Sequence, residues 1–114
     1  MAYDIHQEKD YASDTQLVYE AALKAVEKLG GKFLNSSPDK KSFEVKFDKT
    51  ILGQVLGDRT QMTCVIRPDA EGSRVILDAY PLDAVGRKLM FGARKGVTQT
   101  VIDWFTAHLE NNLK

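Results

Sequence analysis

The chain has 114 residues, of which 43% are hydrophobic and 28% are charged. This length and composition are typical of one globular domain and exclude a disordered or membrane-embedded chain. Its 16 Lys and Arg balance 16 Asp and Glu, so it lacks the strong positive field with which most nucleic-acid-binding proteins hold phosphate. We therefore expect one core and no nucleic-acid partner.

The first residues, 1–12, mix charged and aromatic side chains without a period. They are interpreted as an extended arm or an edge strand that precedes a single α+β domain over residues 13–114. No basic stretch followed by an apolar run marks a secretory leader, and no apolar segment approaches membrane-spanning length. The expected location is the cytoplasm, although a chain that had lost a leader would begin in the same way.

A helix is predicted over about Asp14 to Leu29, because apolar residues recur there every three or four positions. Ser13 and Asp14 are candidate caps for its first turn, and Gln16 follows Ser13 at the spacing of a capping box. The glycine pair at 30–31 can take the left-handed conformation that ends a helix.

The period then changes to two, which predicts strands. Phe33 opens a short strand, residues 42–48 form the second, and residues 60–67 and 74–80 form the third and fourth. Pro81 is expected to stop the fourth strand, because proline has no N–H to donate to a ladder. Short turns between strands favour antiparallel pairing.

A second helix is predicted from about Val97 to Leu113. The fold class expected is α+β, a two-layer sandwich in which an antiparallel sheet of four or five strands carries both helices on one face. Five residues of the strands are expected to face the core: Phe43, Val45, Phe47, Cys64 and Leu77.

The chain resembles small uncharacterised bacterial domains in the order and composition of these elements. The resemblance rests on Ala21-Ala22-Leu23 and Leu29-Gly30 in the first helix, and on Asp39-Lys40 before the alternating strand. It covers roughly residues 13–114 and implies the same helix, antiparallel strands, helix pattern. Those domains have no agreed activity, so it implies no functional residues.

No catalytic or metal-binding constellation is recognised, and no cofactor is expected. Cys64 lies in an apolar run and is interpreted as a buried core thiol, while His6 and His108 have no neighbours at ligand spacing. Asp78 and Asp83 flank Pro81 and are interpreted as turn-capping carboxylates in preference to an acid–base pair.

Two segments are candidate binding surfaces. The connection from Ile51 to Gly57 contains four aliphatic residues where a polar turn would suffice. They either extend the flanking strands and join the core, or form a contact surface for a protein partner or a homodimer. The residues of this candidate interface are Ile51, Leu52, Val55 and Leu56.

The second segment, residues 86–98, contains four cations and no acid, and it leads into the second helix, whose free amides favour an anion. It is interpreted either as a solvated basic connection or as an anion-binding site. The residues of that candidate site are Arg87, Lys88, Arg94, Lys95, Gly96 and Thr98.

From these observations we expect a non-catalytic binding or interaction domain. The alternative is a binding protein or small enzyme for an anionic or phosphorylated ligand held by the basic loop. A flat apolar surface would favour the first function, and a concave pocket with convergent polar groups would favour the second.

Overall fold

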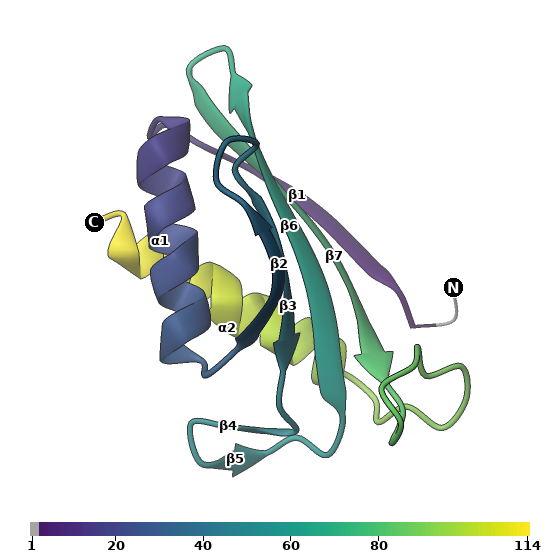
Figure 1. Ribbon diagram of the computed structural model, residues 1–114. Helices are drawn as coiled ribbons and strands as arrows, with labels where there is room; N and C mark the ends of the chain where they lie inside the picture. Colours follow the sequence, from purple (N-terminus) through teal and green to yellow (C-terminus); the bar gives the residue numbers. More distant parts are fainter. Residues whose placement is uncertain (1–2) are drawn as a thin grey trace.

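The computed structural model describes residues 3–114, and its main sheet has five antiparallel strands in the order β1-β7-β6-β3-β2 (Figure 1). Strands β4 and β5 form a separate two-stranded sheet. The elements are β1 (Ile5–Tyr11), α1 (Thr15–Lys28), β2 (Lys32–Ser37), β3 (Ser42–Phe47), β4 (Thr50–Ile51), β5 (Gln54–Val55), β6 (Arg59–Asp69), β7 (Gly72–Leu82) and α2 (Val97–Asn112).

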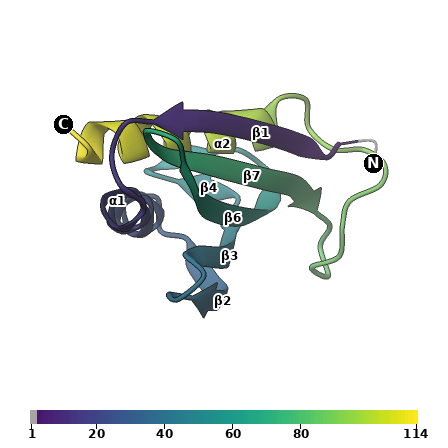
Figure 2. The same ribbon diagram turned by 90° about the horizontal axis from the view of Figure 1, so that it is seen from above.

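Both helices cover the same face of the main sheet, as Figure 2 shows from above. Exposure alternates along β3, β6 and β7, so every second side chain enters the core between the sheet and the helices. The α+β class and the two-layer arrangement predicted from the sequence are therefore confirmed. The five residues expected to face inward are all buried: Phe43, Val45, Phe47, Cys64 and Leu77.

Helix α1 begins one residue later than the capping-box prediction requires. Asp14 is the cap, and its Oδ1 accepts the Leu17 amide at 3.0 Å. The side chain of Gln16 donates to Glu20 one turn later, while the carbonyl oxygen of Ser13 accepts the Ser73 hydroxyl. The capping box at Ser13 was a wrong prediction, because β1 and β7 hold Ser13 outside the helix.

The prediction that Pro81 stops the fourth strand was also wrong, since β7 continues to Leu82 and Pro81 pairs with Thr60. The carbonyl of Pro81 accepts the Leu89 amide, so that side of β7 faces the following loop. Strand β1 has already ended there, with Ile5 opposite Ala79. The missing N–H of Pro81 therefore costs the sheet no strand-to-strand hydrogen bond.

Strand β1 is the edge strand beside β7, with which it pairs from Ile5 to Tyr11. At the opposite edge of the sheet, β2 pairs only with β3. Neither helix in the described part of the chain is long and apolar enough to cross a membrane.

Candidate binding surface and cleft

The connection between β3 and β6 folds into the small β4–β5 hairpin. Its turn places Leu52 at φ 51° and Gly53 at φ 80°, both in the left-handed region. Ile51 is buried and belongs to the core, and Leu56 is half-buried against it. Ile51 must therefore be withdrawn from the candidate interface, whereas Leu52 and Val55 are exposed.

The loop from Asp83 to Gly96 begins in a turn that the Asp83 carboxylate holds. Its Oδ1 accepts the amides of Val85 and Arg87 at 3.0 and 2.9 Å. The turn-capping interpretation of Asp83 is confirmed. Beyond this turn the loop exposes three large apolar side chains, of Val85, Met90 and Phe91.

The far end of the loop is attached to the start of β6 by Arg94. The buried Asp58 carboxylate accepts the Arg94 amide at 2.7 Å and pairs with the guanidinium Nη1 at 3.0 Å. The Gly57 carbonyl accepts the same Nη1 at 3.2 Å. Gly57 has a φ of 98°, which favours glycine, and a Cβ there would displace the Arg94 side chain.

The six residues of the predicted anion site have different surroundings. Helix α2 begins at Val97 as expected, but the charge of Arg94 is balanced by Asp58, and Thr98 is buried. Lys88 pairs with Asp4 at 2.9 Å and lies over the Tyr80 ring. Four of the six residues, Arg94, Lys95, Gly96 and Thr98, line a second pocket of about 460 Å³ beside residues 3–5, whereas Arg87 and Lys88 are not part of its lining.

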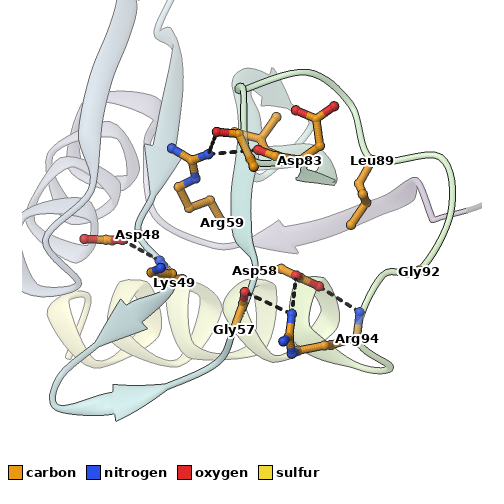
Figure 3. A pocket seen from close by; sticks show the side chains of 11 residues that line it. Asp48, Lys49, Gly57, Asp58, Arg59, Asp83, Leu89, Gly92 and Arg94 are labelled. Carbon is orange, nitrogen blue, oxygen red and sulfur yellow. Dashed lines mark hydrogen bonds and ion pairs between the residues drawn. The ribbon is translucent and has the colours of Figure 1, made fainter.

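A cleft of about 590 Å³ lies between the β4–β5 hairpin side and the 83–96 loop (Figure 3). It is lined by Asp48, Lys49, Gly57, Asp58, Arg59, Leu82, Asp83, Ala84, Leu89, Gly92 and Arg94. Arg59 donates from Nη2 to the carbonyl oxygens of Asp83 and Ala84 at 2.8 and 3.0 Å. The polar groups of the cleft thus hold the surrounding loops together.

The Cys64 thiol and the His6 imidazole are not part of the lining of this cleft. Cys64 is fully buried in the core, and burial raises the pKa of its thiol, so it remains protonated and inert. Among residues 3–114, no group of three or more His, Cys, Asp or Glu side chains could hold a metal ion.

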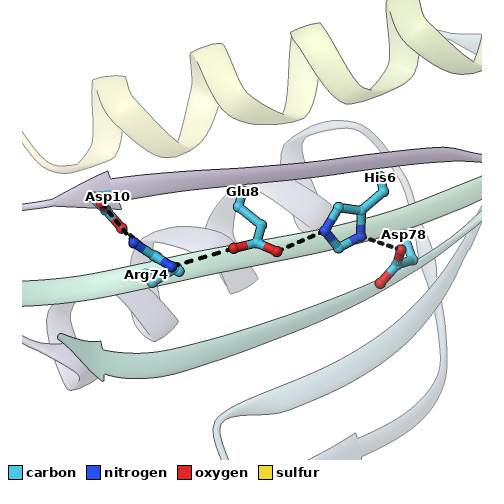
Figure 4. Close-up of polar contacts among 5 residues, drawn as sticks. All are labelled: His6, Glu8, Asp10, Arg74 and Asp78. Carbon is cyan, nitrogen blue, oxygen red and sulfur yellow. Dashed lines mark hydrogen bonds and ion pairs between the residues drawn. The ribbon is translucent and has the colours of Figure 1, made fainter.

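His6 lies on the outer face of the sheet between two carboxylates (Figure 4). Its Nδ1 lies 2.6 Å from Asp78 Oδ1 and its Nε2 lies 2.8 Å from Glu8 Oε2. Asp78, followed by Glu8, raises the pKa of His6. Asp78 does not cap the turn, because its side chain faces β1 across the strand pair, but it is solvated as expected, since that side chain is exposed.

Five exposed apolar side chains flank the cleft, and we call them the tip surface. They are Leu52 and Val55 on the hairpin, and Val85, Met90 and Phe91 on the loop, with exposures of 56, 77, 75, 46 and 86%. Leu52 and Val55 belong to the predicted interface, but the apolar residues of the loop were not predicted to take part. The signal for them is the apolar run Leu89-Met90-Phe91 in a glycine-rich connection.

No family model and no curated protein matches this chain. Solved structures with a similar fold include protein CV1439 from Chromobacterium violaceum, with a TM-score of 0.61, 11% identity and coverage of 99% of this chain and 95% of that one. Ara h 8.0201 has a TM-score of 0.64 and 9% identity, with 97% of each chain covered. The protein TTHA0849 from Thermus thermophilus has a TM-score of 0.53 and 13% identity, with 96% of each covered. At these identities the likeness establishes the fold alone.

Proposed function

We propose that this chain is a non-catalytic interaction domain that binds its partner through the tip surface. The observation that carries the proposal is the exposure of five large apolar side chains on the two connections beside the cleft. Scattered apolar residues are normal on a protein surface, but a group at one end of a small domain is typical of a contact site.

The cleft favours binding over catalysis. Its buried carboxylate, Asp58, is paired with Arg94, and the Asp83 carboxylate accepts two backbone amides. Both carboxylates thus have a structural part, because their hydrogen bonds fix the loops that present the tip surface.

Strain at the hairpin turn also supports a binding function. Leu52 has a positive φ, which costs a branched side chain roughly 1 kcal/mol, whereas glycine or asparagine would adopt it easily. The Leu52 side chain is exposed and offsets little of that cost by burial. An apolar residue held at a strained, exposed position is consistent with selection for contact.

Self-association through Leu52 and Val55 is a second candidate function, because exposed apolar patches commonly pair with a second copy of the same chain. Sedimentation equilibrium distinguishes self-association from binding to a different partner. A concentration-dependent dimer that the double variant Leu52→Asp, Val55→Asp converts to a folded monomer would establish this candidate, and a monomeric wild-type chain would dismiss it.

The tip surface itself can be tested with an apolar probe, 8-anilinonaphthalene-1-sulfonate, followed by amide chemical shifts in NMR. We expect saturable shifts at residues 52–55 and 85–91 that are lost in the double variant Val55→Ser, Phe91→Ser. The matched control is Leu17→Ser, which removes an exposed leucine from α1. Shifts confined to core residues between helices and sheet would indicate an internal ligand site and contradict the proposal.

A further inference from the structure

The geometry points to an anionic lipid surface as the partner of the tip surface, an inference that rests on the function proposed above. The tip would lie against the headgroup region of a bilayer, with its apolar side chains inserted and its cations beside the lipid phosphates. The inference combines three observations on the same end of the molecule: apolar exposure, charge distribution and shape.

The apolar side chains belong to two separate connections, the β4–β5 hairpin and the 83–96 loop, with the polar cleft between them. Figure 1 shows both at the end of the sheet away from the β6–β7 turn. A rigid protein partner needs one continuous complementary face. A bilayer conforms to separate protrusions, and each inserted side chain loses its own contact with water.

Charge is distributed unevenly along the molecule. Residues 48–59 and 83–96, together with Asp4 that pairs with Lys88, contain six Lys or Arg and four Asp, whereas the rest of the chain contains ten Lys or Arg and twelve Asp or Glu. The tip end therefore carries a net charge of +2 and the remainder −2, although the whole chain is neutral. Such a charge asymmetry orients the tip toward a negatively charged surface.

The cations nearest the apolar side chains are placed to reach headgroups. Arg87 and Lys95 are exposed in the same loop as Met90 and Phe91. Two acids of this end are paired with other cations, Asp58 with Arg94 and Asp4 with Lys88, so Arg87 and Lys95 are the cations of the loop outside these pairs. Long cationic side chains beside apolar ones are typical of proteins that lie on a bilayer surface.

The test is co-sedimentation of the full chain with vesicles of phosphatidylcholine alone or with about 30% phosphatidylserine. We expect binding to the anionic vesicles, weaker binding to the neutral ones, and a loss of affinity as salt rises. The double variant Val55→Ser, Phe91→Ser should bind at least about tenfold more weakly. Arg87→Gln and Lys95→Gln should each weaken binding about fivefold.

The matched controls are Leu17→Ser for an exposed apolar residue and Lys24→Gln for an exposed cation, both on α1. They should bind like the wild-type chain. Equal affinity for neutral and anionic vesicles, or an equal loss in the controls, would overturn the inference. Absence of vesicle binding, with the apolar probe still shifting the tip amides, would also overturn it, while leaving the proposed interaction function standing and indicating a protein partner.

Discussion

The same residue type has opposite roles at two positions of this chain. Phe105 is fully buried in α2, and its ring lies 6.4 Å from that of Phe43, centroid to centroid. Phe91 is 86% exposed in the loop beside the cleft. Burial therefore assigns Phe105 to the core, whereas the exposed Phe91 is available for the binding role that we propose.

Truncating each phenylalanine to alanine should separate these roles. Phe105→Ala should lower the free energy of unfolding by about 3–5 kcal/mol, because it removes buried apolar contacts and leaves a cavity. Phe91→Ala should change it by less than about 0.5 kcal/mol. Urea unfolding of both variants measures these changes in the free energy of unfolding. A large destabilisation by Phe91→Ala would contradict the exposed position of this side chain.

His6 makes the edge of the sheet sensitive to pH. Asp78, and after it Glu8, raises the pKa of His6 above its ordinary value of 6.5. The protonated ring can donate to both carboxylates, whereas the neutral ring has one N–H and leaves the other carboxylate facing a lone pair. The contribution to stability is therefore fully present below pH 6.5 and is lost as pH rises through the folded-state pKa.

We expect an NMR titration of the His6 ring to give a pKa above 6.5, and Asp78→Asn to bring it down. The stability difference between the wild-type chain and His6→Gln should shrink as the pH rises from below 6.5. His6 is exposed, so salt should weaken the effect. A pKa at or below 6.5 would rule out the double contact in solution.

At the scale of elements, the start of α1 depends on one carboxylate. Asp14 accepts the Leu17 amide, one of the unpaired donors of the first turn. Asp14→Ala should destabilise the protein by about 1 kcal/mol, whereas Ser13→Ala should have little effect, because Ser13 bonds through its carbonyl oxygen. Thermal unfolding of the two variants measures these losses of stability. A larger loss in Ser13→Ala than in Asp14→Ala would indicate that Ser13 caps the helix.

The β4–β5 hairpin combines strain with exposure at Leu52. Leu52→Asn should raise the free energy of unfolding by about 0.5–1 kcal/mol, because asparagine accepts the left-handed conformation of this turn. It should also weaken vesicle binding by removing an apolar side chain from the tip. Val55→Asn is the control. It also removes an exposed apolar side chain, but Val55 has no positive φ, so this substitution should not stabilise the protein. Reduced stability in Leu52→Asn would contradict the strain argument.

At the scale of the whole molecule, periodicity predicted the helices and central strands well. The alternation of Phe43, Val45 and Phe47 is a local signal, because one face of β3 is buried and the other is not. Strand β1 carries charges toward both faces as an edge strand, so its pattern has no clear period. The sequence therefore predicts either an arm or an edge strand for residues 1–12.

The candidate site was harder to predict, because it depends on contacts between distant parts of the chain. Arg94 and Asp58 are 36 residues apart, and nothing in the local sequence pairs them. The sequence therefore could not predict that Asp58 pairs with the Arg94 guanidinium. Likewise, the aliphatic residues of the hairpin have different exposures, since Ile51 turns toward the core while Val55 faces solvent.

The central claim, that the tip surface is the face that binds an anionic membrane, is tested most directly by residue-level mapping on that membrane. The measurement is paramagnetic broadening of backbone amides in the presence of anionic nanodiscs that contain a headgroup-labelled lipid. Broadening should be strongest at residues 52–55 and 85–91 and weakest at the β6–β7 turn around residues 70–71, at the opposite end of the sheet (Figure 1). Broadening centred on the β6–β7 turn or the helices, or spread evenly over the chain, would contradict the claim.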